Sequence, residues 1–273
     1  MATKAQNKEE IYLQHADSLF KMELYAEAAI AYERSIYAAD TNRTYYHEAL
    51  LKKAFAYKAT GQFSKAFLTL QRTDVLLLSD SVRWIVVYET ILNAYLSGMM
   101  KEAERELLQI EHLNAKDTVR LNDFLFIKIL VLNELQQWES AKQSFEKFLE
   151  LHALPTALSD EYYAFLKNPK LKNPQKARTL STFIPGTGQI YGGNIGQGLV
   201  SLGLQLGLLG FGAFQIWQGY YITGFASGLA LLQAFYFGGI ENAESATIRK
   251  NKEKIARYNG RVKSFVLDVE AGE

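Results

Sequence analysis

The stretch Gly61-Gln62-Phe63-Ser64-Lys65-Ala66 decides the fold of the first half of the chain, because its Phe-Ser-Lys-Ala portion has three counterparts. The equivalent segments are Tyr25-Ala26-Glu27-Ala28, Met100-Lys101-Glu102-Ala103 and Trp138-Glu139-Ser140-Ala141. The alanines that close these segments lie 37 or 38 residues apart. Regular spacing of this length predicts an all-α stack of helix pairs over residues 8–152, in about four repeats.

Each repeat alanine is followed four residues later by a large apolar side chain, which lies on the same helical face. The residues expected to pack the repeats together are Ala28 and Tyr32, Ala66 and Leu70, Ala103 and Leu107, and Ala141 and Phe145. A small residue between larger ones lets the second helix of each pair approach its partner closely. The first helices are expected at residues 11–20, 46–58, 84–96 and 121–135.

The turn and second helix of each pair resemble the tetratricopeptide repeat, whose pattern includes Gly-x-aromatic-x-x-Ala-x-x-x-aromatic. Residues 61–66 match the first part of this pattern, and residues 25–34 match the second. The spacing exceeds the usual length of about 34 residues, the glycine is missing from repeats one and four, and no repeat closes with the usual proline. The resemblance implies a concave surface, lined by the first helices, that holds a protein partner. An irregular helical bundle is the alternative.

The composition changes after Arg178, because no Asp, Glu, Lys, Arg or His occurs from Thr179 to Ile240. As a helix, residues 195–217 are roughly 34 Å long, which is enough to cross a hydrocarbon core about 30 Å thick. Residues 221–240 are nearly as long, and the short connection between them allows only an antiparallel hairpin. We therefore predict a membrane module over residues 179–242, with transmembrane helices near 195–217 and 221–240.

Glycines at small-x-x-x-small spacing predict a surface of close helix-to-helix contact, within the hairpin or its oligomer, rather than a surface that faces lipid. They are Gly203, Gly207, Gly224 and Gly228. Glutamines within or beside the spans need hydrogen-bond partners, which a neighbouring helix can supply. They are Gln197, Gln205, Gln215 and Gln233. The alternative is that the glycines only lower the hydrophobicity or mark a kinked soluble helix. Transport and proton relay are not expected, because no ionisable group lies in the spans.

A glycine-rich element, here termed the Pro-Gly motif, precedes the first span. Its residues are Pro185, Gly186, Gly188, Gln189, Tyr191 and Gly192. It resembles the Pro-Gly-x-Gly-Gln-x-Tyr-x-Gly element that opens a two-helix module of bacterial membrane proteins, some of which also carry tetratricopeptide repeats. The likeness covers roughly residues 176–260 and implies a bacterial membrane, expected to be the inner one, without implying a mechanism. A phosphate-binding loop is not expected, because no strand precedes the motif and no Lys-Ser or Lys-Thr follows it.

Basic residues flank the expected hairpin, in a Pro-containing linker over residues 153–178 and in a C-terminal helix and tail over residues 243–273. Short flanks rich in Lys and Arg stay in the cytoplasm, so the repeats are expected inside the cell. A periplasmic placement is the alternative, because Thr3-Lys4-Ala5 loosely resembles the end of a cleaved leader. The basic residues are expected either to bind anionic lipid head groups or to form a solvated helix face.

Several chemistries are not expected. Cysteine is absent, which excludes disulfides and thiolate zinc sites. The histidines at positions 15, 47, 112 and 152 have no metal-binding spacing. The net charge of +1 gives no global attraction for nucleic acid. We predict no catalytic residue, no metal site, no cofactor and no nucleic-acid partner.

The combination of two binding architectures without catalytic chemistry predicts a membrane-anchored adaptor or scaffold. The repeats would bind a protein partner, and the hairpin would anchor the chain or join a membrane complex. The alternative is an accessory subunit of a bacterial protein insertion, secretion or transport machine.

Overall fold

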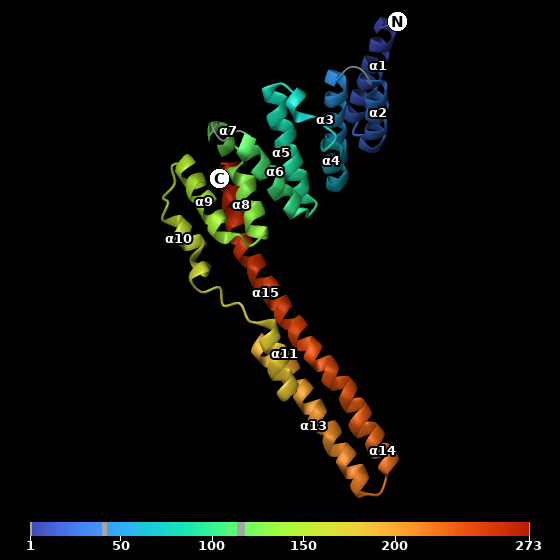
Figure 1. Ribbon diagram of the computed structural model, residues 1–273, viewed down its shortest axis with the longest axis vertical. Helices are drawn as coiled ribbons and strands as arrows, with labels where there is room; N and C mark the ends of the chain where they lie inside the picture. Colours follow the sequence, from blue (N-terminus) through green and yellow to red (C-terminus); the bar gives the residue numbers. More distant parts are fainter. Residues whose placement is uncertain (1, 40–42, 114–117, 273) are drawn as a thin grey trace. The chain divides into compact units, whose positions relative to one another are not determined.

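The computed structural model describes residues 2–39, 43–113 and 118–272, and every regular element within these ranges is helical (Figure 1). The all-α class expected from the sequence is confirmed for this part of the chain. The chain divides into two compact units, Met1–Asp160 and Glu161–Glu273. Each unit is described by itself.

The first unit consists of helices that follow one another along the chain. They are α1 (Ala2–Lys21), α2 (Tyr25–Ala38), α3 (Arg43–Ala59), α4 (Phe63–Leu70), α5 (Asp80–Leu96), α6 (Met100–Leu113), α7 (Thr118–Asn122), α8 (Leu125–Glu134), α9 (Trp138–Leu151) and, at the junction of the units, α10 (Leu158–Tyr162). Consecutive helices pack on each other from α1 to α6, and α8 packs on α9. A short 3-10 helix (Val75–Leu77) lies between α4 and α5.

The four recurring sequence segments begin four helices, because α2, α4, α6 and α9 start at Tyr25, Phe63, Met100 and Trp138. The same backbone turn precedes each of them. In each turn, one residue has left-handed backbone angles. The φ angle is 61° at Glu23, 71° at Gly61, 80° at Gly98 and 60° at Gln136. The next N–H donates to the carbonyl five residues earlier, as in Gln62 to Tyr57 at 2.9 Å and Gln137 to Leu132 at 2.9 Å. This hydrogen bond defines the Schellman motif.

The glycines missing from repeats one and four therefore do not change the turn. Glu23 and Gln136 adopt the left-handed conformation that Gly61 and Gly98 adopt in repeats two and three. A side chain in this region carries a steric cost of roughly 1–2 kcal/mol. The packing of α1 on α2 and of α8 on α9 offsets this cost.

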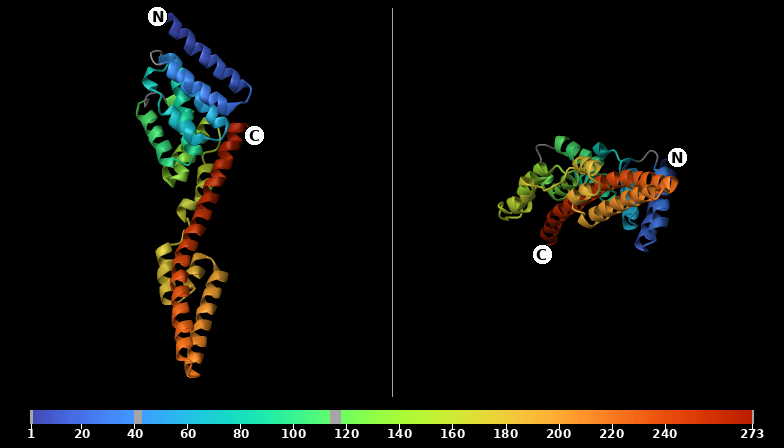
Figure 2. Two further views of the ribbon diagram at one scale, coloured as in Figure 1. Left: turned by 90° about the vertical axis from the view of Figure 1, so that its right-hand side faces the viewer. Right: turned by 90° about the horizontal axis from the view of Figure 1, so that it is seen from below.

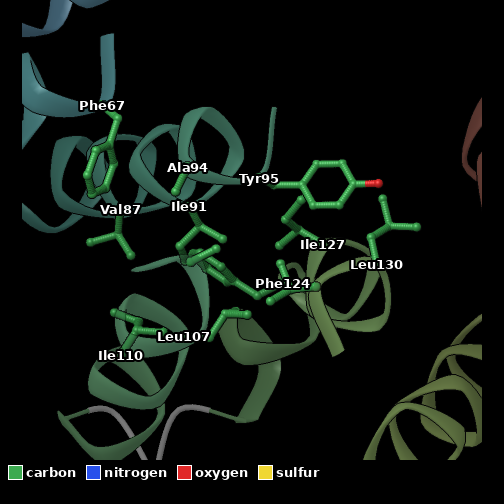
Figure 3. Packing of buried hydrophobic residues seen from close by; sticks show 12 residues of the cluster. Phe67, Val87, Ile91, Ala94, Tyr95, Leu107, Ile110, Phe124, Ile127 and Leu130 are labelled. Atoms are coloured by element: carbon green, nitrogen blue, oxygen red, sulfur yellow. The ribbon is translucent and has the colours of Figure 1, made fainter. Parts of the chain in front are cut away.

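All eight residues expected to pack the repeats are buried, and the four alanines are fully inaccessible. Figure 3 shows a core in which side chains from α4, α5, α6 and α8 converge, among them Phe67, Ile91, Leu107 and Ile127. The expected helix over residues 121–135 is interrupted at Asp123 and Phe124, which separate α7 from α8. The buried ring of Phe124 lies 5.7 Å from the ring of Tyr88 in α5, so this break inserts an aromatic side chain into the core.

The second unit contains two long helices and several short ones. They are a 3-10 helix (Ala164–Lys167), α11 (Pro174–Phe183), α12 (Thr187–Gly192), α13 (Ile195–Trp217), α14 (Tyr221–Phe225), a π-helical turn (Ala226–Ala230) and α15 (Leu231–Ala271). The chain reverses at Gly219, where φ is 87°. Helix α13 packs on α14, on the π-helical turn and on the beginning of α15, so that α13 and α15 lie side by side (Figure 2).

Within the described residues, one helix, α13, is long and apolar enough to cross a membrane, judged by length and composition. Only 11% of its most apolar stretch is buried inside the chain. The second expected span, residues 221–240, is divided among α14, the π-helical turn and the beginning of α15. Helix α15 continues without interruption to Ala271, so the boundary expected at residue 242 falls inside it.

Candidate functional site

The Pro-Gly motif forms the turn between α11 and α12. Half-buried Pro185 follows the end of α11, and Gly186 begins the next turn with φ of 89°. A Cβ at Gly186 would collide with the carbonyl oxygen of Gly198 and lie 3.2 Å from the backbone nitrogen of Leu202. The turn therefore lies directly against the first two turns of α13, and only glycine fits there.

Two further glycines let the short helix α12 contact its neighbours. A Cβ at Gly188 would collide with the carbonyl oxygen of Ala177 in α11, and the Gly188 N–H donates to Ser181 Oγ at 3.0 Å. A Cβ at Gly192 would lie 2.6 Å from Thr247 Oγ1 in α15. The motif glycines thus serve close packing of α12 between α11, α13 and α15.

Gln189 joins three helices through its amide. Its side chain is buried, its Oε1 accepts a hydrogen bond from Ser181 Oγ at 3.0 Å, and its Nε2 donates to the carbonyl of Gly239 at 2.8 Å. Ser181 belongs to α11 and Gly239 to α15. A buried amide needs partners for both of its polar atoms, and here it connects α12 to the helices on either side.

Tyr191 is the motif residue that contacts two lysines of the preceding basic segment. The ammonium groups of Lys172 and Lys176 lie 5.3 Å and 5.5 Å from the centre of its ring, within cation–π range. The Lys172 ammonium also donates to the Tyr191 carbonyl, and the Asn173 N–H donates to the Tyr191 hydroxyl at 3.3 Å. Tyr191 therefore holds the segment that leads into α11.

This segment, residues 168–173, is fixed along α15 by side chains that bond to its backbone, and we call it the strap. Asn251 Nδ2 donates to the Lys172 carbonyl at 2.7 Å, and Asn251 Oδ1 accepts from the Lys172 N–H at 3.0 Å. Lys254 Nζ donates to the Lys170 carbonyl at 2.7 Å, and the Tyr258 hydroxyl donates to the Pro169 carbonyl at 3.2 Å.

Aromatic pairs continue the attachment of the strap toward the end of α15. The rings of Phe165 and Tyr258 are stacked with centres 4.3 Å apart, and those of Tyr162 and Phe265 lie 4.7 Å apart. The expected linker over residues 153–178 thus contains α10, a 3-10 helix and the strap. Both basic flanks come together on this unit. We call their exposed members the basic collar: Lys167, Lys170, Lys176, Arg178, Arg249, Lys252, Arg257, Arg261 and Lys263.

The glycines expected to pack the two spans behave differently from one another. A Cβ at Gly212 would lie 2.7 Å from Gly228 Cα and 3.2 Å from the Gly224 carbonyl oxygen, so Gly224 and Gly228 do contact α13. A Cβ at Gly203 or Gly207 would meet no described atom within 4 Å. Gly203 and Gly207 therefore do not contact the second span within the described part of the chain, and their expected contact with a further helix stays a prediction.

Sequence reasoning pointed to Gln205 as a residue that needs a neighbouring helix, but it missed Gly198 and Gly212, which also face the neighbours of α13. Gly198, Gln205 and Gly212 are the buried members of α13, and they are spaced seven residues apart. A seven-residue spacing keeps one face of a helix against its partner. Gly203 and Gly207 lie outside that series, so the four-residue glycine spacing selected another face of the helix.

In the first unit, polar contacts join helices of neighbouring pairs. Lys52 Nζ lies 2.7 Å from Asp17 Oδ2, and the Tyr32 hydroxyl donates to Asp17 Oδ1 at 2.7 Å. Lys58 Nζ lies 2.8 Å from Glu89 Oε1. Burial and the neighbouring Asp17 carboxylate raise the pKa of Tyr32 above its ordinary range. These contacts link α1 to α3 and α3 to α5 and help to fix the register of the stack.

Two other groups in this unit have shifted pKa values. Burial alone would raise the pKa of Glu33, but hydrogen bonds from Lys53 at 2.6 Å and Arg72 at 3.1 Å outweigh it and lower that pKa. Burial lowers the pKa of His47, although Asp74 partly opposes this effect. Neither imidazole nitrogen of His47 has a hydrogen-bond partner within the described part of the chain.

The described residues contain no group of three or more His, Asp or Glu side chains able to hold a metal ion. A groove of about 880 Å³ between α6, α7, α8 and α9 is lined by both charge signs, including Glu111, Lys128, Lys147 and Glu150. No protein-family model matches the chain, and neither a curated protein nor a solved structure matches it.

Proposed function

We propose that this protein is a membrane-anchored adaptor. Its helical repeats bind a protein partner, and α13 together with residues 221–240 crosses the membrane as a hairpin. The observation that carries the proposal is the exposed surface of α13. This helix is 23 residues long, lacks charge, and leaves most of its apolar side chains uncovered. A lipid environment removes that surface from water.

Further apolar side chains support insertion of the second unit. Phe183 is 80% exposed, and the adjacent turn lies against the first two turns of α13, so this ring would contact lipid with them. At the opposite end of α13, the exposed rings of Trp217, Tyr220 and Tyr221 surround the chain reversal. Trp and Tyr are enriched at the surface of a bilayer.

The basic collar supports the orientation. Its members beside the charge-free segment, such as Lys176 and Arg178, are placed to attract an anionic membrane surface, at about 1 kcal/mol for each basic side chain near that surface. Lys and Arg near the ends of spans favour the cytoplasmic side. We therefore place the repeats in the cytoplasm, at a bacterial inner membrane, with the periplasmic placement as the alternative.

The repeats are assigned to the tetratricopeptide type on the recurrence of one unit of structure. Four helix pairs share the same left-handed turn, the same Schellman hydrogen bond and a buried alanine in the second helix. Stacked units of this kind present extended surfaces that bind peptides or helices. The proposal includes no chemical step, cofactor, metal or nucleic acid.

Anchoring is tested by expressing the full chain in a bacterium and washing the membranes with alkaline carbonate. An integral protein stays in the pellet, whereas release into the wash overturns the proposed hairpin. Protease added to intact spheroplasts tests the orientation. Repeats digested before lysis would lie in the periplasm and would overturn the cytoplasmic placement.

Partner binding is tested by purifying the full chain in mild detergent with its associated proteins. The adaptor proposal predicts a soluble protein that exchanges on and off the repeats. Substituting Lys128 and Lys147, which line the charged groove, by glutamate should weaken its capture. Recovery of a fixed-stoichiometry translocation complex would instead establish the accessory-subunit function.

A further inference from the structure

A mostly apolar groove that carries several polar side chains lies within the second unit. It has a volume of about 470 Å³ and is bounded by α12, α13 and α15. Its polar lining comes from Gln189, Gln197, Ser201, Gln205 and Asn242. No charged side chain lines it within the described part of the chain. The proposed membrane insertion would place this groove in lipid, which supplies no hydrogen bonds.

One lining amide has an unmet hydrogen-bonding requirement. Gln205 is 3% exposed, and its Nε2 donates to Ser201 Oγ at 3.3 Å. Its Oε1 accepts no hydrogen bond from any described residue. Gln189, by contrast, uses both of its polar atoms. Buried acceptors without a donor are destabilising, so this carbonyl points to a donor that the single chain does not supply.

The depth of Gln205 limits what that donor can be. Gln205 lies ten residues after the start of α13, which is about 15 Å along the helix. In a hydrocarbon core about 30 Å thick, this position is near the centre. Lipid head groups and water lie at the surface, so the donor must come from another helix that crosses the membrane.

We propose that two copies of this chain associate through these grooves, with the Gln205 amides exchanging reciprocal hydrogen bonds after a rotamer adjustment. A primary amide carries two N–H donors and a carbonyl acceptor, so two such groups complement each other. The second Nε2 hydrogen of Gln205 is the donor that its counterpart lacks. In a parallel pair with two-fold symmetry, equivalent residues meet at the same depth, so the two amides are aligned automatically.

Two other features of the groove suit a second copy. Because its lining is neutral, two grooves can face each other without charge repulsion. Small residues, including Gly196, Ala234 and Gly238, lie along it and allow backbones to approach closely. The exposed amides of Gln197 and Asn242 at its edge would also find complementary amides in the same interface.

The inference rests on the proposed membrane insertion, and cysteine cross-linking of the full chain in native membranes tests it. The chain has no cysteine, so one introduced thiol is unique. Leu204 lines the groove, whereas Leu206, on the same helix, does not and is exposed. Under mild oxidation, Leu204→Cys should form a covalent dimer and Leu206→Cys should not. Equal cross-linking of both variants, or of neither, overturns the proposal.

A second measurement tests the role of the amide. Energy transfer between labelled chains in lipid vesicles reports association over a range of protein-to-lipid ratios. Gln205→Leu should raise the dissociation constant at least about fivefold. The control Gln233→Leu, a glutamine of α15 outside the groove, should leave it unchanged. Unchanged association of Gln205→Leu overturns the assignment of the amide.

Carbonate washing of the same membranes distinguishes a failure of the proposed anchoring from a failure of the proposed pairing of two copies. If the chain is extracted, the proposed anchoring fails. If the chain is retained but monomeric, or is paired only with a different protein, the anchoring stands and the pairing of two copies is wrong.

Discussion

Replacing Gly212 by alanine would test whether α13 and the helix after it are held together by contact between their backbones. The added Cβ would lie 2.7 Å from Gly228 Cα and 3.2 Å from the Gly224 carbonyl oxygen. Carbon atoms pack at roughly 3.5–4.0 Å, so the two backbones would have to separate locally by about 1 Å. Gly207→Ala is the matched control, because a Cβ there meets no described atom within 4 Å.

The expected magnitude follows from the difference between these two variants. Alanine is favoured over glycine in a helix interior by about 1 kcal/mol, and this gain applies equally to both positions. Overpacking a close contact costs typically about 1–3 kcal/mol, and this cost applies only at Gly212. We therefore expect Gly212→Ala to be less stable than Gly207→Ala by about 1–3 kcal/mol.

Thermal unfolding of the full chain in detergent, followed by circular dichroism, measures this difference. For a chain of this length, 1 kcal/mol corresponds to a change in Tm of roughly 2–4 °C. Gly207→Ala should unfold at or above the temperature of the unmodified chain, and Gly212→Ala below it. Equal unfolding temperatures for the two variants would show that the backbone contact at Gly212 does not hold these helices together.

Three further outcomes are expected. Asn251→Ala should speed tryptic cleavage next to Lys172, because the strap backbone loses both of its bonds to that amide; an unchanged digestion pattern would contradict the strap. The lowered pKa of Glu33 means that its ion pairs stabilise the fold above its ordinary pKa of 4.5 and are lost as the pH falls through the folded-state value. Unfolding measured against pH should therefore show less loss on acidification in Glu33→Gln. The lowered pKa of His47 likewise predicts loss of stability as the pH falls below 6.5, and His47→Phe should reduce that loss.

The recurring segments predicted the starts of four helices because one side-chain pattern and one turn repeat together. They did not predict that Glu23 and Gln136 would take left-handed backbone angles, since neither residue favours that region by itself. The position of these two residues in the repeat, between two helices that pack on each other, determines the turn, and their own backbone preference does not. No feature of the sequence indicated the interruption of the helix at Phe124, because the apolar pattern of α7 and α8 continues through this position.

The Pro-Gly motif was recognised as an element without a mechanism, and the structure gives it a packing role. Gly186, Gly188 and Gly192 are placed where a side chain would collide or crowd a neighbour. The partners of these glycines come from α11, α13 and α15, and no local spacing reports such distant contacts. The strap was missed for the same reason, because it depends on Asn251 reaching a backbone far from it in sequence.

The unbroken course of α15 has a mechanical consequence. At 41 residues it is about 60 Å long, roughly twice the thickness of a hydrocarbon core. A helix with all of its internal hydrogen bonds changes length very little, so an axial shift or a twist at one end reaches the other end nearly undiminished. Such a rod would carry a change in the packing of its first half to the half that holds the strap.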